Sequence, residues 1–189
     1  MTSALRRRAA FLFLCALLGA CAQITLVEPK RHKIGDAFSV EAQIAWNRFP
    51  ADKTEVWTVD GPRLQALRFF KGVEDEEPLL EASEDAKLPL FRATMTPNEV
   101  MELVVDTFSR SGASQVEARG LRPADFGDAP GFRFEFTFLD GEGLETEGMA
   151  SGAVIEDRLY MILYTGSRVH YFPKHKNQVD KLLDSVETI

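Results

Sequence analysis

The stretch GFRFEFTFL, residues 131–139, carries a phenylalanine at every second position from Phe132 to Phe138. Charged or hydroxyl side chains alternate with the rings, and this period of two is typical of a β-strand with one buried face. Burial of apolar surface contributes about 25 cal/mol per Å², so a row of phenylalanines is a large stabilising contribution. The stretch therefore predicts a strand at the centre of the hydrophobic core. A row of this kind could alternatively line a pocket for an apolar ligand.

Further strands are predicted on both sides of this row. Phe38–Trp46 alternates strictly and predicts one strand, while Thr54–Val59 and Leu64–Phe70 predict a hairpin. After the row, Glu147–Ile155 predicts a returning strand. Leu159–Thr165 is apolar at most successive positions, which predicts a central strand covered on both faces.

Three segments have less regular patterns. Ser114–Leu121 predicts a modest strand, and residues 123–130 predict a connection. Gly72–Phe91 is rich in acidic residues and contains Pro78 and Pro89, which predicts a solvated surface loop. Its carboxylates could hold a cation, although their spacing does not match an EF-hand loop.

Two helices are predicted to pack on the sheet. Residues 96–99, Thr-Pro-Asn-Glu, have the pattern of a capping box with proline at the first helical position. Near the C-terminus, Pro173 is expected to open a helix whose apolar residues at 179, 182, 183 and 186 form one stripe. The predicted fold class is α+β over residues 37–189, a mostly antiparallel β-sheet of about six to eight strands with helices packed on it.

The N-terminus has the features of an export signal. Arg6–Arg8 precede an apolar run from Ala9 to Leu18, about ten residues, whereas a membrane-spanning helix needs about 20. Leu18-Gly19-Ala20-Cys21 then resembles the bacterial lipobox, in which the cysteine thiol receives a diacylglyceryl group and becomes the new N-terminus after cleavage. The resemblance implies a lipoprotein signal peptide over 1–20, lipidation of Cys21 and a lipidated tether over 21–36. An ordinary signal peptide with a chance cysteine is the alternative.

Lipidation implies that the protein is held on a membrane by acyl chains on Cys21, with its domain in the periplasm. Ala22 follows the cysteine, and by resemblance to enterobacterial sorting this favours the outer membrane over the inner one. The tether contains one strand-like piece at Ile24–Val27. Its basic cluster at Lys30–Lys33 could touch lipid headgroups or simply be solvated.

Charge and cysteine content exclude several function classes. The chain carries −7, and its first 20 residues contain three arginines and no acidic residue, so the part from Cys21 carries about −10. That balance argues against nucleic acid as a partner, because nucleic-acid binding needs a basic face. The two cysteines are Cys15, which would leave with the signal, and Cys21, which would be acylated. The domain would then have neither a catalytic thiol nor a disulfide.

No catalytic motif is recognisable, and the candidate residues are few. His32, His170 and His175 are expected to be surface residues, with metal ligation or general-base work as the less favoured interpretation. Glu145 and Glu147 lie on one side of a predicted strand and could act as an acid–base pair, but charged residues beside a hairpin are ordinarily solvated. Ser151-Gly152 lacks the strand–turn–helix context of a serine nucleophile. We therefore expect no catalytic residues, no metal site and no cofactor.

The order of these elements resembles the Mog/PsbP-like fold. The resemblance rests on Phe38–Trp46 before a hairpin, Gly131–Phe134, Arg158–Tyr160 and the terminal helix at 179–186. It implies an α+β domain and no particular binding or catalytic residues, since members of this fold bind unrelated partners.

The sequence thus predicts a non-enzymatic envelope lipoprotein that acts through contacts with other envelope proteins. The first alternative is a carrier or sensor of a small apolar ligand lined by the Phe132 row. A hydrolase with dispersed catalytic residues is less favoured.

Overall fold

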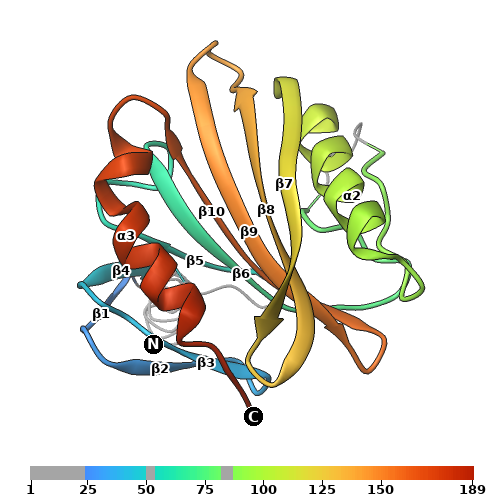
Figure 1. Ribbon diagram of the computed structural model, residues 1–189. Coiled ribbons are helices and arrows are strands. Elements are labelled where there is room, and N and C mark those ends of the chain that lie inside the picture. Colours follow the sequence, from blue (N-terminus) through green and yellow to red (C-terminus); the bar gives the residue numbers. More distant parts are fainter. Residues whose placement is uncertain (1–23, 50–53, 82–86) are drawn as a thin grey trace, which may run out of the picture.

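The computed structural model describes residues 24–49, 54–81 and 87–189, which form a sheet-based α+β domain (Figure 1). Its helices are α2 (Pro97–Arg110) and α3 (Tyr171–Asp184). Its strands are β1 (Thr25–Val27), β2 (Arg31–Ile34), β3 (Phe38–Glu41), β4 (Trp46–Phe49), β5 (Thr54–Thr58), β6 (Gln65–Val73), β7 (Ser114–Phe126), β8 (Ala129–Leu139), β9 (Glu145–Ile155), β10 (Arg158–Ser167) and β11 (Glu187–Thr188).

Within these residues the main sheet has eight strands in the order β1-β4-β5-β6-β10-β9-β8-β7. Every neighbouring pair in it is antiparallel. A small sheet of three strands, β11-β3-β2, lies beside α3 (Figure 1). The predicted fold class, a mostly antiparallel sheet with helices packed on it, is confirmed.

The main sheet is covered on both faces, so the domain has two hydrophobic cores. The α3-side core joins Val179 and Leu182 of α3 and Phe38 of the small sheet to Trp46 and Trp57 of the main sheet. The α2-side core joins Val100, Leu103 and Val104 of α2 to Phe70, Phe132, Phe134, Phe136, Met161 and Leu163 of the main sheet. Figure 1 shows the two helices on opposite sides of the sheet.

The Phe132 row packs as predicted. Phe132, Phe134 and Phe136 are at most 3% exposed, and Phe108 of α2 lies 5.3 Å from Phe136 and 5.0 Å from Phe138 between ring centroids. Offset and tilted ring pairs at such distances add to the stabilisation from burial. The row is the sheet side of one of the two cores.

The predictions for β10 and α2 are confirmed in detail. β10 pairs with β6 on one side and β9 on the other, and its successive residues Met161 and Ile162 enter opposite cores. At the start of α2 the backbone N–H of Glu99 donates to Thr96 Oγ1 (3.4 Å), and that of Thr96 donates to Glu99 Oε2 (2.7 Å). These two bonds satisfy donors that a helix N-terminus otherwise leaves unpaired.

The prediction of one strand over Phe38–Trp46 is wrong. β3 ends at Glu41 in the small sheet, and β4 begins at Trp46 in the main sheet. The backbone N–H of Ala42 donates to the carbonyl of Lys30 (2.9 Å), after which the chain leaves the small sheet. Both strands face the α3-side core. The buried residues of the two strands therefore continue one alternating pattern, although they belong to different strands.

The prediction of a connection over residues 123–130 is also wrong, because β7 continues to Phe126. Its register against β8 shifts between Ser114 and Glu117 and between Arg119 and Arg122, with positive φ at Gln115 (52°) and Gly120 (67°). Bulges disturb the alternation of side chains, and an edge strand can include a proline whose missing N–H faces solvent. These two effects conceal the strand in the sequence.

The terminal helix begins before Pro173. α3 starts at Tyr171, with His170 at the N-cap, and the proline lies in the first turn, where its missing N–H costs no helical hydrogen bond. The two-residue strand β11 follows the helix and was not predicted.

Residues assigned to the tether and to the acidic loop are more ordered than predicted. β1 and β2 lie within residues 25–34, and Val27 and Ile34 are buried. In the described part of Gly72–Phe91, Leu79 and Phe91 are buried, so this segment packs against the α2-side core.

Candidate functional site

The predicted lipidation residue Cys21 lies outside the described residues, as do the predicted signal peptide and the rest of the lipobox. The described chain starts at Ile24, directly before the edge strand β1, with Ile24 and Leu26 exposed. In the part of the chain that the structure describes, no helix is long and apolar enough to cross a membrane.

The basic cluster on and before β2 is largely neutralised by neighbouring carboxylates. Lys30 Nζ lies 2.7 Å from Glu28 Oε2, and Arg31 lies 3.0 Å from Glu187 Oε1. These pairs are exposed and add little to stability, but they remove the excess positive charge that an anionic headgroup would meet. The structure therefore gives no support to a basic lipid-binding patch at this end.

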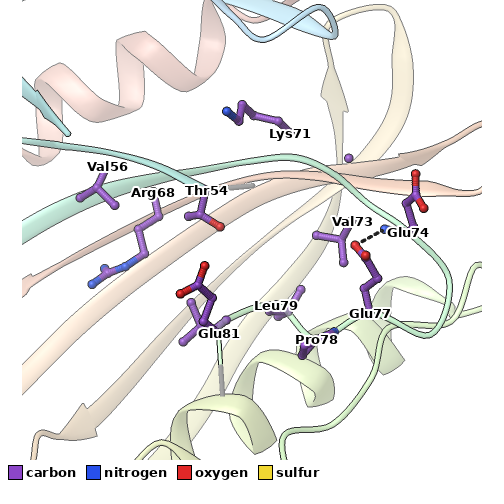
Figure 2. Close-up of a pocket in the computed structure, with 12 residues that line it drawn as sticks. Thr54, Val56, Arg68, Lys71, Val73, Glu74, Glu77, Pro78, Leu79 and Glu81 are labelled. Atoms are coloured by element: carbon purple, nitrogen blue, oxygen red, sulfur yellow. Dashed lines mark hydrogen bonds between the residues drawn. The ribbon is translucent and has the colours of Figure 1, made fainter. Parts of the chain in front are cut away.

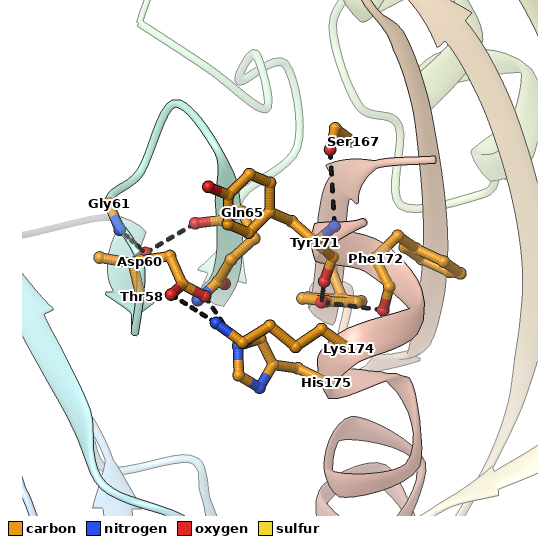
Figure 3. Close-up of polar contacts among 10 residues, drawn as sticks. Thr58, Asp60, Gly61, Gln65, Ser167, Tyr171, Phe172, Lys174 and His175 are labelled. Carbon is orange, nitrogen blue, oxygen red and sulfur yellow. Dashed lines mark hydrogen bonds and ion pairs between the residues drawn. The ribbon is translucent and has the colours of Figure 1, made fainter. Parts of the chain in front are cut away.

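A charged cluster connects the β5–β6 turn to the first turns of α3 (Figure 3). Asp60 accepts a hydrogen bond from Lys174 Nζ (2.7 Å), and its other oxygen lies 2.8 Å from His175 Nε2. Thr58 holds the turn in place, because its hydroxyl donates to the carbonyl of Gln65 (2.7 Å) and accepts from the backbone N–H of Gly61 (2.9 Å). The cluster brings together residues more than 110 positions apart.

The charges of this cluster affect two pKa values. Burial opposes ionisation of Asp60, but the hydrogen bonds from Lys174 and His175 together outweigh it and hold the pKa of Asp60 below its usual value. Burial, assisted by the negative charge of Asp60, raises the pKa of Tyr164. The Tyr164 hydroxyl donates to the carbonyl of Tyr171 (2.9 Å), so it stays protonated and anchors the start of α3.

His175 is buried at 6% exposure, so the prediction of a surface histidine is wrong for it. It precedes Val179 by four residues and Leu182 by seven, which places it on the buried stripe of α3. That spacing was the sequence signal for burial of His175. The local sequence contains no signal for its partner Asp60.

A histidine held by a carboxylate can serve as a general base if a substrate reaches its other ring nitrogen. His175 and Asp60 line none of the three cavities described for this part of the chain. The pair therefore supports a structural role, fixing α3 against the β5–β6 turn.

The remaining candidate residues are not brought together. His32 lies in β2, and His170 is exposed at the N-cap of α3. Glu145 pairs with Arg168 (3.3 Å) and Glu147 with Arg119 (3.3 Å), so each carboxylate has its own cation. Ser151 is buried within β9. No group of three or more His, Cys, Asp or Glu residues that could hold a metal ion occurs among the described residues.

A cavity of about 810 Å³ lies between β5–β6 and residues 77–81 (Figure 2). Its lining includes Val56, Arg68, Val73, Leu79 and Glu81. The Phe132 row does not line it, but Phe138 of that row lines a separate cavity of about 170 Å³ together with Phe108. This cavity was not predicted from the sequence, where the one available signal was Arg68, a charge within the otherwise apolar run Ala66–Phe70.

Arg68 is a cation in the middle of the main sheet. It lies opposite Val56 of β5 and Leu163 of β10, and its guanidinium donates to Thr165 Oγ1 (3.2 Å). Among the described residues, no carboxylate is within ion-pair distance of it. Burial lowers the pKa of Arg68, yet a guanidinium remains charged at neutral pH. Arg68 thus places a positive charge beside the apolar side chains of the cavity. The lining also includes Lys71, whose side chain lies against Gly35, and the carboxylates of Glu74, Glu77 and Glu81.

Comparison of the structure with solved proteins identifies its fold. The cyanobacterial PsbP protein (CyanoP) from Synechocystis sp. PCC 6803 superposes with a TM-score of 0.53 and 16% sequence identity, covering 91% of this chain and 99% of CyanoP. The domain has a PsbP-like fold. LpqN of Mycobacterium tuberculosis, involved in cell envelope biogenesis, is more distant, with a TM-score of 0.40 and 9% identity over 90% of this chain and 87% of LpqN. No family model matches the sequence, and no curated protein matches it either.

Proposed function

We propose that the protein is a bacterial envelope lipoprotein, anchored by acyl chains on Cys21, that acts through contacts with other envelope proteins and not as an enzyme. The observation that carries the proposal is Leu18-Gly19-Ala20-Cys21 directly after a basic segment and a short apolar run. By analogy with sorting elsewhere, Ala22 favours the outer membrane.

The start of the described domain fits a short anchor. Two residues, Ala22 and Gln23, separate Cys21 from Ile24, and the three residue steps span roughly 10 Å at about 3.5 Å per extended residue. An anchored Cys21 would therefore hold β1 close to the bilayer surface. The exposed apolar side chains of Ile24 and Leu26 would then lie nearest to the membrane.

Surfaces far from β1 are the ones that a partner would reach. Figure 1 shows the β8–β9 tip and the β10–α3 loop at the end of the sheet away from β1. Leu144 and Val169 are exposed apolar residues there, Val169 at 88%. The N–H of Arg168 donates to the carbonyl of Glu145 (3.0 Å), which keeps the two segments together.

The anchor is tested by labelling cells with a palmitate analogue. The wild type and Cys15→Ser should both be labelled, because Cys15 leaves with the signal, whereas Cys21→Ser should not be. Label on Cys21→Ser, or its loss from Cys15→Ser alone, would contradict lipidation at Cys21.

The mode of action is tested by photo-crosslinking in cells, with the crosslinking residue placed at Val169. A defined envelope protein should be captured there and not from the exposed control position Asp125, at the other end of β7. Equal or no capture at both positions would contradict a contact surface at this end.

A further inference from the structure

We propose that the cavity beside Arg68 binds a small amphipathic monocarboxylate, with the carboxylate on the guanidinium and the apolar part along Val56, Val73 and Leu79. This site is independent of the lipid anchor and of the proposed protein contacts. Three features support this site: the charge of Arg68, the cavity beside it and the placement of the acidic residues.

The first support is the state of Arg68. Arg68 is half-buried within the sheet, and an arginine in such a place ordinarily has a carboxylate partner, because removing an unpaired charge from water is unfavourable. Here the one side-chain partner among the described residues is the neutral hydroxyl of Thr165, at 3.2 Å. A guanidinium has five N–H donors in a planar fork, so most of them remain for a ligand carboxylate.

The second support is the cavity itself. Its volume of about 810 Å³ falls within the roughly 300–1,000 Å³ of small-molecule sites. Val56 and Val73 line it from the sheet, and Leu79 and Leu80 line it from the facing segment. Apolar walls beside the Arg68 guanidinium match a molecule with one anionic end and an apolar body.

The third support is how the acidic residues are distributed. In Figure 2, Glu74 and Glu77 lie at the opposite end of the cavity from Arg68. Glu74 already pairs with Arg158 (2.9 Å), whereas the exposed Glu81 lies on the Arg68 side of the cavity in Figure 2. None of these three carboxylates is within ion-pair distance of Arg68 in the described part of the chain, and together they disfavour a ligand with further negative charges. The ligand class is therefore a monoanion.

The test uses the full chain in lipid nanodiscs and ¹⁹F NMR titration with 8-fluorooctanoate and its neutral counterpart 8-fluorooctanol, with empty nanodiscs as the baseline. The wild type should bind the carboxylate about tenfold or more tightly than the alcohol, as expected for a charge-assisted hydrogen bond. Arg68→Met should lose about tenfold or more in carboxylate affinity and bind the alcohol as the wild type does.

Two further variants separate the proposal from a general effect of charge or folding. Arg63→Met removes an arginine whose side chain is 81% exposed and should leave carboxylate binding unchanged. Arg68→Lys keeps the charge and should retain part of the binding, and a thermal melt checks that each variant is folded. Absence of carboxylate binding by the wild type, equal binding by Arg68→Met, or equal affinity for the alcohol would overturn the site.

Discussion

Replacing Asp60 by Asn should destabilise the domain by about 2 kcal/mol at neutral pH. The Asp60 side chain is 21% exposed and accepts hydrogen bonds from Lys174 and His175. Lys174 is 41% exposed, so its ion pair contributes only about 0.5 kcal/mol. His175 is 8% exposed, and depriving a buried polar group of its partner costs about 1–3 kcal/mol. Lys174 and His175 use different oxygens of Asp60, and Asn would place its NH2 donor at one of these two positions.

Thermal unfolding followed by circular dichroism measures this loss. For a domain of this size, 2 kcal/mol corresponds to a fall in Tm of about 4–8 °C. Lys174→Met is the matched control, since it removes the exposed pair and leaves the bond between Asp60 and His175. Its Tm should fall by no more than about 2 °C.

The difference between wild type and Asp60→Asn should depend on pH. The folded pKa of Asp60 is lowered, so its contribution is fully present above the unfolded pKa near 4 and is lost as pH falls through the folded value. The two proteins should therefore differ by a constant amount from about pH 7 to 5 and converge below about pH 4. Equal stability at pH 7, or a difference that persists unchanged to pH 3, would refute the role given to this carboxylate.

Three further variants test the packing and the local signals. Gly148→Ala should lower the free energy of unfolding, measured in urea, by about 2 kcal/mol, because a Cβ there would lie 2.3 Å from the ring of Phe136. Gly141→Ala is the control and should be neutral, because a Cβ there meets nothing within 4 Å. Thr96→Ala removes the N-cap of α2 and should lower the free energy of unfolding by about 1 kcal/mol, and an unchanged midpoint would mean that the capping box is dispensable. Arg68→Met should leave Tm unchanged or raise it, since it replaces an unpaired charge in the sheet by an apolar side chain, and a marked fall would mean that Arg68 stabilises the fold.

Much of the architecture was predictable because some structural features are determined by residues within one short segment. Thr96 to Glu99 contain both partners of the capping box, and the pattern at Leu159–Thr165 reports burial on both faces directly. The Phe132 row was correctly placed in a core for the same reason. In each case the interacting groups, or the periodicity that they create, are local.

Other features were predicted wrongly because the contact that decides each of them joins residues far apart in the sequence. Phe38–Trp46 divides between two sheets that share one core, and the bulges of β7 interrupt its alternation. His175 stands on the buried stripe of α3, but its partner Asp60 is 115 residues away. Periodicity gives the buried face of a segment and not the identity of the element that covers it.

The sequence by itself determined the export and lipobox pattern, the absence of a recognisable catalytic motif, and an α+β domain with a mostly antiparallel sheet, because each is expressed in consecutive or periodically spaced residues. The tertiary structure alone decided that the sheet has two cores, that Asp60 and His175 meet, and that Arg68 faces a cavity without a carboxylate partner among the described residues. Those outcomes depend on which strands become neighbours. Strand pairing over long separations is set by the packing of the whole domain, and no short segment contains it.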